Sequence, residues 1–178
     1  MDLLSLDYEF SKDLLHYILS GYYSSILWEP TGPFAIKSNT SPFSANVKLK
    51  VKTSLDTFGG QIHRSFDVDF PSKDISSKHY KDILCSQRIK FLKKPFSYET
   101  LLFQLILWGE YTALSYLYEL KTSPSFTLHF IYGVISDLRI ADSINDNFWS
   151  EFEEYCKIYT YADRIAMKLE EDALVSVT

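Results

Sequence analysis

Glu110 is the residue whose position in this sequence most strongly suggests a chemical role. Helical spacing places its carboxylate on one stripe of a helix predicted over residues 98–121, together with Phe103, Ile106, Leu107, Leu114 and Leu117. A carboxylate in a core must be paired, protonated or open to solvent through a cleft, because an isolated buried charge is very costly. We expect an ion pair with Arg64, Arg139 or Arg164. The alternative is a functional buried acid with a raised pKa.

Asp67 and Asp69 form a second candidate site, because two carboxylates at alternate positions of a strand lie on the same face. Residues 58–60 (Phe-Gly-Gly) followed by residues 67–70 (Asp-Val-Asp-Phe) resemble a degenerate nucleotidyltransferase pattern, in which such a pair holds Mg²⁺. The resemblance implies a metal-dependent nucleotidyltransferase or nuclease. Only six residues separate the two motifs, too few for the helix between them in that family. The competing interpretation is structural, with Asp67 facing Lys48 across two antiparallel strands.

The remaining reactive side chains show no spacing typical of a metal or cofactor site. The 4 histidines form no HxxxH or HxH motif, and the sequence contains no P-loop, GxSxG motif or Rossmann glycine run. Cys85 and Cys156 belong to no CxxC pair, which favours two reduced core thiols. We therefore expect no cofactor and no resident metal, and we expect that the chain is not an enzyme.

The hydrophobic pattern predicts a single α+β domain over residues 1–178, mainly helical, with an antiparallel hairpin or small sheet packed on helices. Val47, Leu49 and Val51 alternate with lysines, and residues 62–70 repeat this period of two. The predicted hairpin therefore comprises residues 46–53 and 61–70.

Helical periodicity covers most of the rest of the chain. Helices are predicted between Ser11 and Pro30 and over residues 98–121, 123–138 and 146–169, with a strand as the alternative for part of 123–138. The signals between 71 and 94 are weaker and predict a short helix near Tyr80 and a strand over 88–92. We expect residues 29–45 to form a loop and residues 170–178 to form a frayed tail.

Charge is segregated along the chain, whose net charge is −5. Residues 37–94 hold twelve Lys/Arg against five Asp/Glu, whereas residues 137–178 hold four against ten. An acidic C-terminal region beside a basic centre suggests that electrostatics either hold the chain together or attract a charged partner. The predicted partner-binding residues lie on the last helix and just before it, and they are Asp142, Asp146, Glu151, Glu153, Glu154 and Tyr161.

These features favour a cytoplasmic inhibitor that neutralises a basic protein, in the manner of the bacterial or phage immunity proteins and antitoxins that block nuclease-like toxins. The acidic balance, the 13 Tyr and 13 Phe and the missing catalytic motifs all agree with a protein-binding surface. No secretory signal or uncharged apolar span is visible, so we expect no membrane partner. A pI of about 5.3 disfavours nucleic acid as the partner. The oligomeric state is left open.

Overall fold

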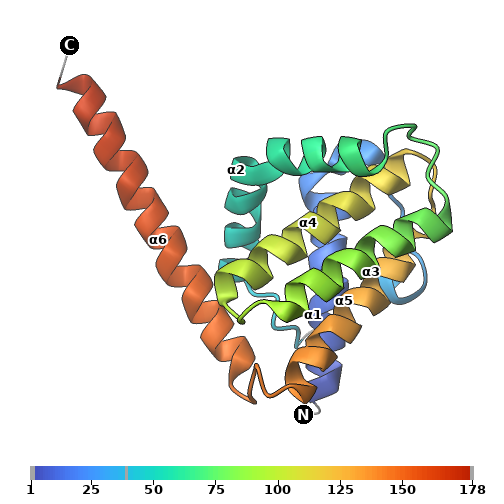
Figure 1. Cartoon of the computed structure of the whole chain (residues 1–178). Coiled ribbons are helices and arrows are strands. Elements are labelled where there is room, and N and C mark those ends of the chain that lie inside the picture. Colours follow the sequence, from blue (N-terminus) through green and yellow to red (C-terminus); the bar gives the residue numbers. More distant parts are fainter. Residues whose placement is uncertain (1–2, 39, 177–178) are drawn as a thin grey trace.

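The structure, a computed structural model, describes residues 3–38 and 40–176, and this part of the chain contains helices and loops but no β-strand (Figure 1). The α-helices are α1 (Leu3–His16), α2 (Ala45–Asp69), α3 (Ser77–Lys93), α4 (Tyr98–Leu117), α5 (Ser123–Ile140) and α6 (Phe148–Val175). A π-helix, η1 (Tyr17–Tyr22), and two 3₁₀ helices, η2 (Ser24–Ile26) and η3 (Gly32–Ala35), connect α1 to α2. The prediction of an α+β fold is therefore wrong, and the molecule is a helical bundle.

The predicted hairpin of residues 46–53 and 61–70 is instead the continuous helix α2. Ser44 caps this helix, because its hydroxyl accepts a hydrogen bond from the backbone N–H of Val47 at 3.4 Å. The apolar residues of this segment also recur at spacings of four and seven positions, which are typical of one helix face. Those that are buried are Val47, Val51, Leu55, Ile62 and Phe66. A short apolar pattern can fit both the two-residue period of a strand and the 3.6-residue period of a helix. Packing of α2 on α4 and α6 favours the helix.

Two consequences follow from the helical course of α2. Lys48 and Asp67 lie near opposite ends of one helix, so the predicted contact between them across two strands is absent. Lys48 lies over the ring of Tyr17 instead, 5.1 Å from its centroid, and Asp67 pairs with Lys73. Figure 1 also shows that α2 bends sharply along its length, and the pair Gly59-Gly60 provides the kind of position at which helices kink.

Residues 88–92, predicted as a strand, belong to α3. This helix begins after Ser76, whose hydroxyl accepts a hydrogen bond from the backbone N–H of His79 at 3.0 Å. Because the period is helical, Phe91 is buried while Ile89 points to solvent. At the other end of the chain, α6 continues to Val175, where the sequence predicted a frayed tail from residue 170.

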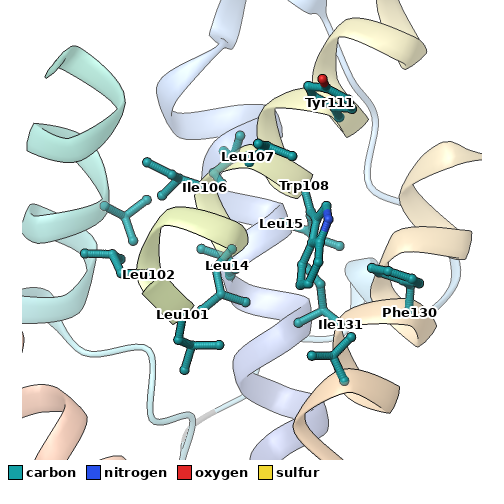
Figure 2. Close-up of a cluster of buried hydrophobic side chains, with 14 of the residues drawn as sticks. Leu14, Leu15, Leu101, Leu102, Ile106, Leu107, Trp108, Tyr111, Phe130 and Ile131 are labelled. Atoms are coloured by element: carbon teal, nitrogen blue, oxygen red, sulfur yellow. The ribbon is translucent and has the colours of Figure 1, made fainter. Parts of the chain in front are cut away.

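The central helix of the bundle is α4, which is buried on nearly every side. Figure 2 shows its core residues beside those of α1 and α5, and the labelled side chains include Leu101, Leu102, Ile106, Leu107, Trp108, Leu14, Leu15, Phe130 and Ile131. Trp108 packs edge-on against Phe130, with 4.9 Å between the ring centroids. None of the helices in the described ranges combines the length and apolar character needed to cross a bilayer.

The most buried side of α4 is not the predicted stripe. Leu117, placed on that stripe, is 50% exposed, whereas Leu105, which the spacing did not place on it, is 1% exposed. The contact between α4 and η1 depends on Gly109, because a Cβ atom there would lie 2.3 Å from Cδ1 of Ile18. The bare backbone at Gly109 thus lets η1 approach α4 next to Glu110.

Candidate functional site

An acidic surface lies where α5 ends and α6 begins. Asp142 and Asp146 are exposed there and line an open pocket of about 500 Å³, whose other lining residues are Arg139, Ile144, Asn145 and Asn147. Asp142 has a φ of 54°, a left-handed conformation that Asp tolerates better than most residues. The turn therefore brings two of the predicted partner-binding carboxylates to one pocket.

The arginine in this pocket is neutralised from within the bundle. Asp7 of α1 is fully buried, and its carboxylate accepts hydrogen bonds from Arg139 Nε at 2.6 Å, from Arg139 Nη2 at 2.7 Å and from Trp149 Nε1 at 2.8 Å. The hydrogen bonds to Asp7 raise the pKa of Arg139 above its ordinary value. Because this guanidinium is already paired, the net charge that the pocket presents is that of Asp142 and Asp146.

The three predicted glutamates of α6 lie in different environments. Glu154 is exposed, and one of its carboxylate oxygens lies 3.9 Å from Lys157 Nζ. Glu151 is exposed too, but it accepts a hydrogen bond from the hydroxyl of Tyr98 at 2.6 Å.

Glu153 is half-buried and accepts a hydrogen bond from the side-chain amide of Asn46 at 3.3 Å. Glu151 and Glu153 therefore help to attach α6 to α4 and α2, and Glu154 is the glutamate with its carboxylate turned to solvent. Tyr161 belongs to α6, but its side chain lies outside the described residues.

A second site surrounds Glu110, whose side chain is fully buried at the junction of α4, α2 and the end of η1. Its Oε1 atom lies 2.7 Å from His63 Nε2 and accepts a hydrogen bond from the hydroxyl of Tyr23. Its Oε2 atom is buried and has no hydrogen-bond partner among the described residues. The side chain of His63 is 46% exposed, so its imidazole connects the buried carboxylate to solvent. The expected arginine partner is thus replaced by a histidine and a tyrosine.

The two acidic groups of this cluster have shifted pKa values. Burial raises the pKa of Glu110, while the hydrogen bond from Tyr23 and the charge of His63 lower it in part. Burial also raises the pKa of Tyr23, and its hydrogen bond to Glu110 raises it further. Tyr23 therefore stays protonated and remains a hydrogen-bond donor to Glu110.

A neighbouring contact repeats the same pairing of tyrosine and carboxylate. The hydroxyl of Tyr22 donates to Asp56 Oδ1 at 2.7 Å, and Asp56 also pairs with Lys52 at 3.0 Å. The rings of Tyr22 and Tyr23 contact each other edge-on, with centroids 4.8 Å apart. Two adjacent tyrosines thus fix the end of a π-helix on α2 and α4, and π-helical turns often occur at functional sites.

Asp67 and Asp69 do not form a joint site. Residues two apart on a helix point about 200° apart, so the shared strand face is lost with the hairpin. Asp67 pairs with Lys73, and Asp69 Oδ2 accepts a hydrogen bond from the hydroxyl of Tyr111 at 2.6 Å. Within the described ranges, no group of three or more His, Cys, Asp or Glu is placed to hold a metal ion.

Sequence reasoning identified Glu110 but missed His63 and Tyr23. The sequence separation of Tyr23 and Glu110 is 87 residues, and no local motif links them. The available signal was indirect, namely that a carboxylate in a core requires a polar partner. In comparisons with families of known proteins, with curated sequences and with solved structures, no match to this chain was found.

Proposed function

We propose that this protein binds a basic protein through the acidic surface formed by Asp142, Asp146 and Glu154, and that it inhibits this partner. The observation that supports the proposal is the open pocket at the α5–α6 connection, whose two aspartates are exposed while its arginine is paired with Asp7. A Lys or Arg side chain of a partner suits such a pocket, because its charge meets two carboxylates and its aliphatic stem meets Ile144.

The specific form of this proposal is an immunity- or antitoxin-type inhibitor that acts in the cytoplasm on a basic, nuclease-like toxin or effector. A net charge of −5 favours a basic partner, since long-range attraction speeds the encounter of oppositely charged proteins. The nature of the toxin and the compartment stay predictions.

Fluorescence anisotropy with a labelled peptide rich in Lys and Arg tests the acidic surface directly. We expect the triple variant Asp142→Lys, Asp146→Lys and Glu154→Lys to bind this peptide at least about tenfold more weakly than the wild type. We also expect the binding to weaken as salt rises, because the contacts are solvent-exposed. Glu151 and Glu153 stay unchanged in this variant, since their replacement would disturb the attachment of α6.

The control must change the net charge by the same amount at other exposed acids. Glu29, Asp74 and Glu119 are exposed and lie outside the acidic surface, so the triple variant with lysine at these positions is matched in charge. If both triple variants weaken binding equally, only the overall charge matters, and the proposed surface is wrong. Selective loss in the first variant supports the surface.

A further inference from the structure

A second pocket lies next to the acidic pocket at the α5–α6 connection. Its volume is about 230 Å³, and it forms where the ends of α3 and α5 meet the segment that leads into α4. Its lining includes Phe91, Phe96, Leu138, Ala141, Ser143 and Lys94. Phe91 and Leu138 are buried members of the hydrophobic core, so an edge of the core forms part of the pocket wall.

The turn that ends α5 separates the two pockets. All residues from 138 to 144 except Ile140, which is 83% exposed, line one pocket or the other. The acidic pocket is lined by Arg139, Asp142 and Ile144, and the second pocket by Leu138, Ala141 and Ser143. A backbone hydrogen bond of 2.9 Å from the N–H of Ser143 to the carbonyl of Leu138 closes the turn. Because consecutive Cα atoms are only about 3.8 Å apart, one bound segment can place neighbouring side chains in both pockets.

The two pockets favour different side chains. The acidic pocket presents the carboxylates of Asp142 and Asp146, which suit a basic side chain. In the second pocket, Asp137 accepts a hydrogen bond from Arg88 Nε at 2.9 Å, so its charge is balanced, and exposed Lys94 makes the lining positive. The second pocket therefore repels a basic side chain, whereas an uncharged apolar side chain can bury its surface against the aromatic and aliphatic wall.

We propose that the segment recognised by the acidic surface carries an apolar side chain beside its basic side chain, and that the second pocket binds the apolar one. This inference rests on the proposed function, because the acidic pocket positions the basic side chain. A pocket of about 230 Å³ is smaller than the sites of drug-sized ligands, about 300 to 1,000 Å³, and suits one side chain. The opposite charges of the two linings set the direction in which the segment binds, and the apolar anchor limits the partner to segments with both side chains.

Two labelled peptides of equal length and charge test the second pocket by fluorescence anisotropy. One alternates Arg with Leu, and the other alternates Arg with Ser. We expect wild-type protein to bind the Arg/Leu peptide at least about tenfold more tightly, since burial of one leucine side chain supplies a factor of this size. The triple lysine variant of the acidic surface should bind both peptides more weakly. If the wild type binds neither peptide, the proposed function is wrong, and this inference fails with it.

A substitution inside the second pocket tests where the leucine binds. Ala141→Gln places a longer polar side chain in the pocket without changing the net charge, and it should remove most of the preference for the Arg/Leu peptide. The matched control is Ala173→Gln, the same change at an exposed position near the end of α6, which should keep the preference. If the wild type shows no preference, or if both variants behave alike, the second pocket is not the anchor site. Binding of the Arg/Ser peptide would then still support the proposed function.

The positive charge of the second pocket provides a separate test with a peptide of Arg alone. Lys94→Glu should tighten the binding of this peptide more than Lys93→Glu does, because Lys94 lines the pocket and its exposed neighbour Lys93 does not. Long-range attraction changes equally in the two variants, so the difference between them reports the pocket. Equal tightening would overturn the claim that Lys94 excludes a basic side chain from this pocket.

Discussion

Replacing Glu110 by Gln tests whether the protein holds this carboxylate in an environment that disfavours its charge. The amide has nearly the same shape, and its oxygen can accept the hydrogen bonds that Tyr23 and His63 make to Oε1. The amide nitrogen then takes the place of Oε2, which is buried without a hydrogen-bond partner among the described residues. The substitution therefore removes the charge and preserves most of the contacts.

The sign of the pH dependence follows from the direction of the pKa shift. Burial raises the pKa of Glu110 in the folded state above its ordinary value of 4.5. Between these two values the native state keeps a proton that the unfolded state has lost, so stability falls as pH rises. The contribution of this group is complete below pH 4.5 and is lost as pH rises through the folded-state pKa, with a slope of up to about 1.4 kcal/mol per pH unit.

The variant should therefore lose stability at low pH and recover relative to the wild type as pH rises. Near pH 4 the wild-type side chain is neutral and buries one O–H without an acceptor, whereas the amide of Glu110→Gln buries two N–H groups, so the variant costs about 1 to 3 kcal/mol for the additional donor. Above the folded-state pKa the wild type carries the additional cost of a buried charge, so this difference should shrink or reverse. Urea unfolding followed by tryptophan fluorescence, repeated from about pH 4 to about pH 8, measures both curves.

Tyr23→Phe tests the same pKa shift from the other side, because it keeps the Glu110 carboxyl and removes a hydrogen bond to it. The hydrogen bond from Tyr23 lowers the pKa of Glu110, so its removal should shift the decline in stability to higher pH. A ¹³C NMR titration of the Glu110 carboxyl reads the same shift directly. If the wild type and Glu110→Gln give parallel stability curves, or if the carboxyl titrates at or below pH 4.5, the reasoning is refuted.

Four further substitutions test the bundle that positions these sites. Leu105→Ala should destabilise the protein by about 2 to 5 kcal/mol, whereas Leu117→Ala, at a half-exposed position, should cost less than about 1 kcal/mol; equal costs in thermal unfolding would contradict the assigned core face. Asp7→Asn should cost about 3 to 5 kcal/mol by urea unfolding, because it leaves a partly buried guanidinium without its charged partner, and a neutral result would contradict this ion pair. Gly109→Ala should cost about 1 to 3 kcal/mol by urea unfolding, since Ile18 must move from its packed position and this strain exceeds the gain of about 1 kcal/mol in helix propensity; unchanged stability would contradict the close approach of η1.

Part of the fold could be predicted from the sequence because three helices carry long periodic segments. The predictions of helices over 98–121, 123–138 and 146–169 are confirmed in location by α4, α5 and α6. Ser97 marks the first of these starts, since its hydroxyl accepts a hydrogen bond from the backbone N–H of Thr100 at 3.1 Å. Signals of this kind lie within a few residues of one another and do not depend on tertiary packing.

The hairpin could not be excluded from the sequence, because its apolar residues fit two periods. Gly59-Gly60 reinforced the error, since a glycine pair between two apolar segments is typical of a turn. In the structure the same pair lies within α2, and Gly59 faces α4, where a Cβ would lie 3.6 Å from Glu110 Oε1. The contacts that favour a helix join α2 to α4 and α6, which are distant in sequence. A local residue pattern therefore cannot reveal them.

For the candidate site, the sequence predicts that the C-terminal region is acidic, but packing determines which of its acids face solvent. The acidic excess of residues 137–178 predicts a negatively charged C-terminal region, but it assigns the same role to every acid in it. The structure separates Asp142, Asp146 and Glu154 from two acids that attach α6: Glu151, which is exposed but accepts a hydrogen bond from Tyr98, and half-buried Glu153, which accepts one from Asn46. A charge reversal of all these acids would therefore weaken both the attachment of α6 and the acidic surface. Only substitutions confined to Asp142, Asp146 and Glu154 can therefore test the proposed partner binding without disturbing the attachment of α6.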